Sequence, residues 1–229
     1  AVAWFTGAQD TARVRVAWAG LLGLIAGCGG SSSSATPAGP QWTLDRAAVV
    51  DAFDYWQSAV GIDYVLIEAD ALPRILVRLG NDGLGPQGGG RAGIDGTFTD
   101  NRAQSGIVVI EPEGGQYCRS GAAWCRYLYR HEIGHALGFL AHSDFGLMNA
   151  TPDVLVDREK RMIAALYSLP HGAQVEEDGT WSVPATGAEG RLDDVQTARD
   201  VIAWNMNAPA GGSHPQLGVI SRWGLPVRW

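Results

Sequence analysis

The residues best suited to chemistry lie in one short stretch, residues 131–143. His131 and His135 are four positions apart, so on a helix their imidazoles share one face and can bind one metal ion. Glu132 follows the first of these histidines and can act as a general base on a water held by that metal. Because zinc lowers the pKa of a bound water to about 7, this His-Glu-x-x-His pattern predicts a zinc hydrolase.

The pattern continues beyond the second histidine. Gly138 follows His135 by three residues and can adopt the left-handed conformation that ends a helix and turns the chain back. His142 comes next, and Met148 lies six residues beyond it. Three of the five histidines therefore fall within twelve residues, a clustering that indicates a metal site.

This extended motif resembles that of the metzincin clan of zinc endopeptidases, and within the clan it is most similar to the matrixins. The residues that carry the resemblance, besides the first two histidines and their glutamate, are Gly134, residues 136–138, the pair 142–143 and Met148, which matches the methionine turn.

The resemblance implies a Zn²⁺ ion with three histidine ligands, His131, His135 and His142. It implies that Glu132 is the catalytic base and that Met148 forms an apolar floor beneath the metal. It also implies that the substrate is a protein or peptide, hydrolysed at a peptide bond.

The chain departs from the family at one place. Matrixins have two residues between the glycine and the third histidine, whereas this chain has three, residues 139–141. The family's ligand position falls on Ala141, which cannot bind metal. Either the turn contains one extra residue and His142 ligates, as we expect, or another group such as Asp144 does. A third layout uses a glutamate ligand, for which Glu159 is the candidate; Gly138 and the methionine turn argue against it.

Two other classes of protein, a surface binding protein and a nucleic-acid-binding protein, fit the sequence less well. A surface binding protein with a structural or degenerate zinc site would explain the extra residue, but such a site needs no base at Glu132. A nucleic-acid-binding protein is excluded by the net charge of −7 and the pI near 5.1. We therefore expect a monomer that binds no nucleic acid.

The first part of the sequence resembles a bacterial lipoprotein signal. Arg13 and Arg15 precede an apolar run that is too short for a permanent membrane span, and residues 24–28 resemble a lipobox. The resemblance implies a signal peptide over residues 1–27, lipid on Cys28 and a flexible anchored linker over residues 28–41. We thus expect a membrane-anchored protein in the cell envelope, facing outside the cytoplasm, in the outer membrane if there is one, or else secreted.

The two remaining cysteines, Cys118 and Cys125, precede the histidines. In an oxidising compartment they would form a disulfide that ties the approaching loop to the first turn of the metal-binding helix. Closing so short a loop stabilises a fold by about 2–3 kcal/mol. The alternative is a pair of free thiols.

The hydrophobic pattern predicts both helices and strands over residues 42–172. The resemblance implies that they form an α+β, metzincin-like zinc peptidase domain with a small twisted mixed sheet, a central zinc-binding helix, a methionine turn and a C-terminal helix. The expected elements are a helix over 44–59, strands over 62–68, 74–79, 94–99 and 106–111, a central helix from 120 or 121, and a helix over 158–169 capped by Asp157. By the resemblance, residues 92–99 form the sheet edge that binds an extended substrate, and residues 149–152 form part of a specificity-pocket wall.

Residues 80–93 contain seven glycines in fourteen positions, with no context for phosphate binding. The simplest interpretation is a surface loop. A structural Ca²⁺ bound by Asp82 and Asp95 is the alternative.

The matrixin resemblance does not extend into residues 173–229, a C-terminal extension of unknown role. Residues 174–183 predict a hairpin around Asp178-Gly179, and residues 192–205 predict an amphipathic helix. We expect this segment to pack on the catalytic domain. His171 and His214 lie outside the motif and are not expected to be ligands.

Overall fold

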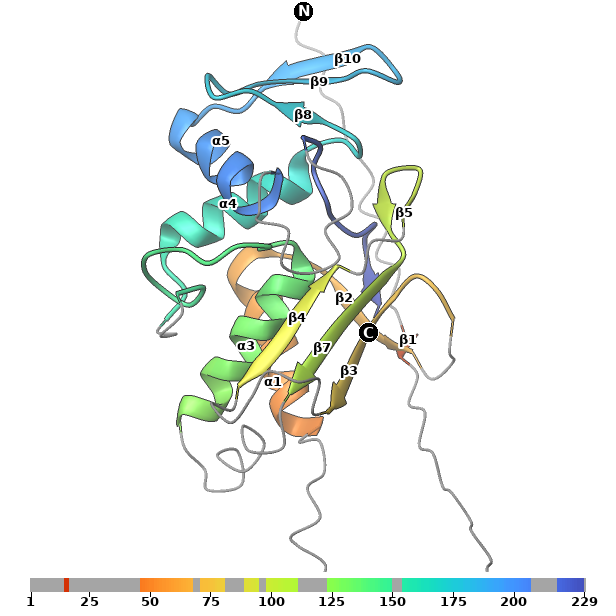
Figure 1. The fold of residues 1–229 in the computed structure, drawn as a ribbon, viewed down its shortest axis with the longest axis vertical. Coiled ribbons are helices and arrows are strands. Elements are labelled where there is room, and N and C mark those ends of the chain that lie inside the picture. The colour runs from red at the N-terminus through yellow and green to blue at the C-terminus, as the bar shows by residue number, and fades with distance from the viewer. Residues whose placement is uncertain are drawn as a thin grey trace, which may run out of the picture.

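The computed structural model describes residues 15–16, 46–67, 71–80, 89–94, 98–110, 123–149, 154–206 and 218–228. Several predictions fall outside these residues: the signal segment apart from residues 15–16, the linker, Cys28, Asp82, Asp95, Cys118, His214 and most of the predicted pocket wall. Cys125 lies in a helix, but its side chain is not among those described. Within the described part, the protein has the α+β class that the sequence predicts (Figure 1).

A mixed three-stranded sheet has the order β3 (Arg74–Leu79), β7 (Ser105–Ile110), β4 (Gly90–Ile94). Strand β3 runs parallel to β7, and β4 runs antiparallel to it. The central strand β7 contributes Val108, Val109 and Ile110, all fully buried. Strand β4 lies at the edge, so one side of its backbone has no strand neighbour among the described residues.

The strand expected at 94–99 is wrong in its bounds. Strand β4 ends at Ile94, and residues 98–99 form a separate short strand, β5 (Phe98–Thr99), paired with β6 (Arg102–Ala103). Positive φ values of 49° at Asp100 and 58° at Asn101 let two residues close this hairpin. The sequence pattern did not reveal the true bounds of β4 because this strand contains glycines, which are depleted in strands. The sheet edge is therefore at 90–94.

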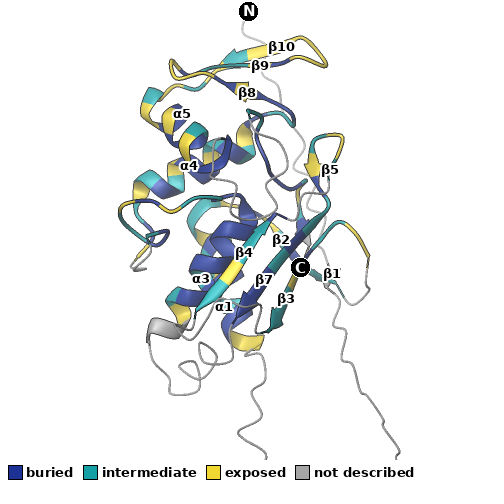
Figure 2. Cartoon of the chain, viewed as in Figure 1, coloured by how far each residue is buried: buried dark blue, intermediate teal, exposed yellow. Residues whose placement is uncertain are grey.

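Helix α1 (Arg46–Val60) and helix α3 (Ala123–Leu137) pack against each other, and α3 also contacts β4. Helix α1 presents an apolar stripe whose buried members are Ala48, Val49, Ala52, Phe53 and Trp56. Helix α3 is buried along most of its length between α1 and the sheet (Figure 2). It ends at Gly138, which has the positive φ of 123° that the sequence predicts for a turn there.

Helix α4 (Asp157–Ser168) lies on the other side of the loop that follows α3 (Figure 1). The prediction that Asp157 caps this helix is wrong, because Asp157 is its first residue and Val156 precedes it. The backbone N–H of Val156 is instead satisfied by the carboxylate of Glu159, 3.1 Å away.

The C-terminal extension begins with a meander of β8 (Gln174–Val175), β9 (Thr180–Val183) and β10 (Ala188–Arg191). Gly179, with φ of 92°, lies in the predicted turn. The helix expected at 192–205 is two segments, α5 (Val195–Val201) and the π-helix η1 (Ile202–Met206). Asp194 caps α5 by accepting hydrogen bonds from the N–H groups of Gln196 and Thr197.

The chain then returns to the N-terminal part. Strand β11 (Val227–Arg228) pairs in parallel with β2 (Tyr64–Ile67), which also pairs with β1 (Arg15–Val16). Residues after 172 belong to the same hydrophobic core as the helices and the sheet, through Val175, Val183, Ala198, Val201, Trp204, Met206, Ile220, Trp223 and Val227. The extension therefore packs on the predicted catalytic domain. In the described part of the chain, no helix is long and apolar enough to cross a membrane.

Candidate metal centre

Three histidines meet where α3 ends. The Nε2 atom of His131 lies 3.1 Å from that of His135 and 3.2 Å from that of His142. Two nitrogens bound to one tetrahedral zinc ion at about 2.0–2.1 Å lie about 3.3 Å apart. The three nitrogens thus have the spacing of ligands around one ion, and among the described residues this is the one group with that property.

The hydrogen-bond partners of His131 and His135 favour a cation between the two rings. The Nδ1–H of His131 donates to the carbonyl of Leu147, 2.7 Å away, and that of His135 donates to the carbonyl of Phe139. A neutral imidazole protonated on Nδ1 has a lone pair on Nε2. Two lone pairs that face each other at 3.1 Å repel, so the pair fits a bound metal ion better than a hydrogen bond.

The electrostatic environment keeps the three histidines neutral. Burial lowers the pKa of His131 to about 4 and that of His135 to about 3. Burial also lowers the pKa of His142, whose ring is exposed on one side. At neutral pH no proton competes with a metal ion for these nitrogens. The exposure of His142 places the group at the surface, where another molecule can reach it.

Glu132 lies beside the sheet edge. Its side chain packs on Gly90 of β4 so closely that a Cβ atom on Gly90 would be 2.5 Å from the Glu132 Cγ. Only 5% of Glu132 is exposed, and burial raises the pKa of its carboxyl to about 8. A divalent cation on the adjacent histidines would favour the charged form and oppose this shift. The predicted base and the edge strand are thus in direct contact.

Met148 packs against the helix that carries His131 and His135. A Cβ on Gly134 would be 2.5 Å from the sulfur of Met148 and 2.6 Å from the indole of Trp56. Only glycine at position 134 therefore allows the methionine and the tryptophan to approach the helix. The indole N–H of Trp56 also donates to the carbonyl of Arg130, 2.8 Å away.

The loop that carries Met148 is held by Glu159, a role that the sequence analysis missed. This carboxylate is fully buried and accepts four hydrogen bonds, from Ser143 Oγ and from the backbone N–H groups of Leu147, Met148 and Val156, at 2.8–3.1 Å. All its acceptor positions face these donors, and Glu159 is outside the histidine group. The geometry thus argues against a glutamate third ligand. Glu159 lies on the buried stripe of α4, three residues before Met162 and four before Ile163. An acidic residue at such a position was the signal that could have revealed this role.

The extra residue before His142 does not remove that histidine from the group, and Asp144 is exposed and outside it. The lengthened turn has backbone partners at each step. Phe139 N–H donates to the Gly134 carbonyl at 3.0 Å, and the N–H groups of Leu140 and Ala141 both donate to the carbonyl of Trp204, at 2.7 and 3.2 Å.

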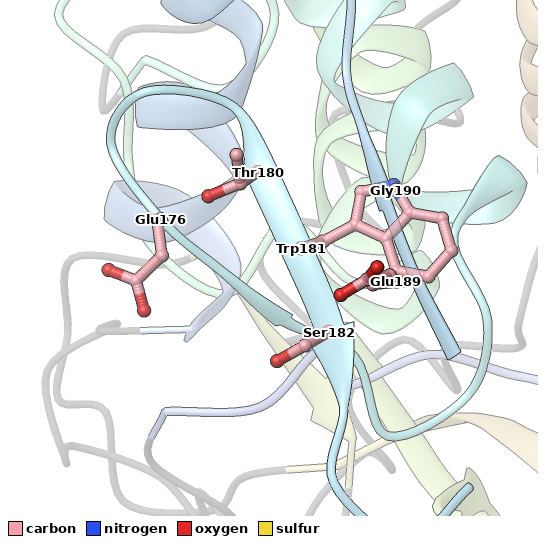
Figure 3. A pocket seen from close by; sticks show the side chains of 6 residues that line it. All are labelled: Glu176, Thr180, Trp181, Ser182, Glu189 and Gly190. Atoms are coloured by element: carbon pink, nitrogen blue, oxygen red, sulfur yellow. The ribbon is translucent and has the colours of Figure 1, made fainter. Parts of the chain in front are cut away.

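A hollow of about 380 Å³ lies on the C-terminal meander, away from the histidines (Figure 3). Its lining residues are Glu176, Thr180, Trp181, Ser182, Glu189 and Gly190. The indole of Trp181 occupies the space beside Gly190, where a Cβ would be 2.4 Å from it. None of these residues belongs to the histidine group.

Comparison with known proteins adds no assignment to this geometry. No protein-family model matches the chain, and a search of curated proteins finds no match. The functional conclusion therefore depends on the site itself and on the motif that forms it.

Proposed function

We propose that the protein is a zinc-dependent endopeptidase of the metzincin type. The observation that carries this proposal is the convergence of the Nε2 atoms of His131, His135 and His142, with Glu132 next in the chain to the first. Nitrogen-only ligands favour zinc over calcium or magnesium, which prefer oxygen. Three protein ligands leave a fourth position for a water or substrate, as catalytic zinc sites require.

When bound, a zinc ion would polarise a substrate carbonyl and lower the pKa of a water to about 7. The carboxylate of Glu132 accepts the proton of the attacking water and delivers it to the leaving nitrogen. The Leu147 and Phe139 carbonyls hold the rings of His131 and His135 in the tautomer that binds metal.

The sheet edge supports a peptide substrate. Strand β4 is an edge strand whose Gly90 contacts Glu132, so an extended peptide paired with β4 would lie beside the base. From the lipobox resemblance we further propose that lipid on Cys28 anchors the protein in the cell envelope, with substrates outside the cytoplasm. A structural Ca²⁺ at Asp82 and Asp95 is not needed by this proposal.

The test replaces Glu132 by glutamine, which keeps the shape of the side chain and removes the base. We expect Glu132→Gln to retain one zinc ion per chain and to digest casein at least about 100-fold more slowly. Glu177→Gln, an exposed position on the meander, is the matched control and should keep the full rate. Zinc is measured by elemental analysis, and a chelator should stop digestion by the unaltered protein.

Two results would contradict the proposal in different ways. An undiminished rate in Glu132→Gln would remove the role of the base. Bound zinc without cleavage of any protein or peptide library would instead favour the alternative, a surface binding protein with a structural metal site.

A further inference from the structure

The C-terminal extension contacts the turn that carries the third histidine. The carbonyl of Trp204, in η1, accepts both N–H groups of the lengthened part of the turn, Leu140 and Ala141. The Trp204 indole also stacks on Phe139, with ring centroids 4.9 Å apart and planes at 23°. Trp204 thus binds the turn through both its backbone and its side chain.

Asn205, the next residue, connects the start of the same turn to the last segment of the chain. Its side-chain amide donates to the carbonyl of Gly138 at 2.7 Å and to that of Ser221 at 2.8 Å. Its side-chain oxygen accepts the N–H of Ser221 at 2.8 Å. Asn205 is fully buried, so removing its side chain leaves buried backbone groups without these hydrogen-bond partners.

A third set of contacts joins α5 and η1 to α4. Arg158 of α4 donates to both carboxylate oxygens of Asp200, at 2.6 and 2.8 Å. The same guanidinium lies over the rings of Phe145 and Trp204, at 5.0 and 5.2 Å from their centroids. Phe145 belongs to the loop after His142, so Arg158 contacts both this loop and η1.

We propose that this extension positions the third metal ligand, with Asn205 and Trp204 as the positioning residues. The inference depends on the proposed metal site and deepens it. An added residue gives the turn more conformational freedom, which lowers metal affinity unless other contacts hold the ligand in place. The contacts of Trp204 and Asn205 begin at Gly138 and cover the three residues before His142, where this freedom arises.

The test measures the affinity of the full chain for Zn²⁺ and Co²⁺ by competition with a chromophoric chelator. Asn205→Ala should raise the dissociation constant about 10- to 100-fold. This is the loss of metal affinity that is typical when a residue that helps to orient a ligand is removed. Asn205→Ser, whose hydroxyl can still donate to one of the two carbonyls, should give an intermediate value. The ligand-field spectrum of the Co²⁺ form should change less in Asn205→Ser than in Asn205→Ala.

Asp194→Ala is the matched control, because it removes the cap of α5 and leaves the contacts of Asn205 intact. It should lower Tm and leave the metal dissociation constant within about twofold. A double-mutant cycle with His142→Ala then separates positioning from general stability. If Asn205 acts through His142, Asn205→Ala should cause no further loss of affinity in the His142→Ala background.

The possible failures are distinguishable. Unchanged affinity in Asn205→Ala, or an equal loss with and without His142, overturns the positioning role alone. Unchanged affinity in His142→Ala overturns the ligand set of the proposed function, and the positioning role with it.

Discussion

The Nδ1–H of His131 donates to the carbonyl of Leu147, sixteen residues later in the chain, at 2.7 Å. This bond joins the first histidine of the candidate metal centre to the loop that carries Met148, and the N–H of Leu147 donates in turn to the buried carboxylate of Glu159. A helix-borne histidine is thus oriented by a loop, and the loop is held by the next helix.

Replacing Glu159 by glutamine should therefore affect both stability and the metal site. The amide nitrogen of glutamine cannot accept the two hydrogen bonds that one carboxylate oxygen accepts, so two buried donors lose their partner. We expect Glu159→Gln to lower the free energy of unfolding by about 3 kcal/mol or more in urea titrations. The exposed Glu176→Gln should change it by less than about 0.5 kcal/mol. If Glu159→Gln unfolds at the same urea concentration as the unaltered protein, Glu159 does not hold this loop.

The identity of the third ligand is tested with two neighbouring residues. We expect His142→Ala to weaken zinc binding at least about 100-fold, because it removes one of the three proposed protein ligands. Asp144→Ala should leave zinc binding unchanged, since its exposed carboxylate lies outside the group. Isothermal titration of the metal-free proteins with Zn²⁺ distinguishes these outcomes. The opposite pattern would move the ligand to Asp144.

Two glycines on β4 make a matched pair for testing the position of Glu132. A Cβ on Gly90 would be 2.5 Å from the Glu132 Cγ, whereas a Cβ on Gly93 would meet nothing within 4 Å. We expect Gly90→Ala to displace the carboxylate and to lower peptidase activity about tenfold or more, with zinc content unchanged. Gly93→Ala should keep activity within about twofold. Equal activities in the two variants would show that Glu132 does not depend on this contact.

The half-buried His171 predicts a pH effect on stability. Burial, and then the charges of Arg222 and Arg102, lower its pKa from 6.5 to about 4. The folded state therefore binds fewer protons than the unfolded state in this window, so stability is present above pH 6.5 and is lost as the pH falls toward 4.

We expect the free energy of unfolding of His171→Gln to fall less steeply between pH 6.5 and pH 4 than that of the unaltered protein. If the unfolded state binds one proton more than the folded state, the free energy of unfolding changes by about 1.4 kcal/mol per pH unit. Solvent screening makes the contribution of this half-exposed ring smaller. Urea titrations across this range, with a chelator present throughout, give the two slopes. Identical slopes would mean that His171 does not titrate in the folded state at an altered pKa.

Much of the fold was predictable from local pattern. The apolar stripe of residues 46–60, the alternation in residues 74–79 and the glycine at 138 each report a structure formed by neighbouring residues. The bounds of β4 were not predictable, because its glycines have low strand propensity and its position is decided by pairing with β7. The division of residues 195–206 into α5 and η1 likewise follows from packing against the turn after α3.

The sequence by itself located the candidate site, because the spacing of His131, Glu132 and His135 on a helix is a local property. Only the tertiary structure decided the rest. Three features depend on segments far apart in the chain: the position of His142, not Asp144, beside His131 and His135, the use of Glu159 as an anchor, and the contact of Asn205 with Gly138. Such contacts follow from three-dimensional packing, which residue spacing along the chain does not encode directly.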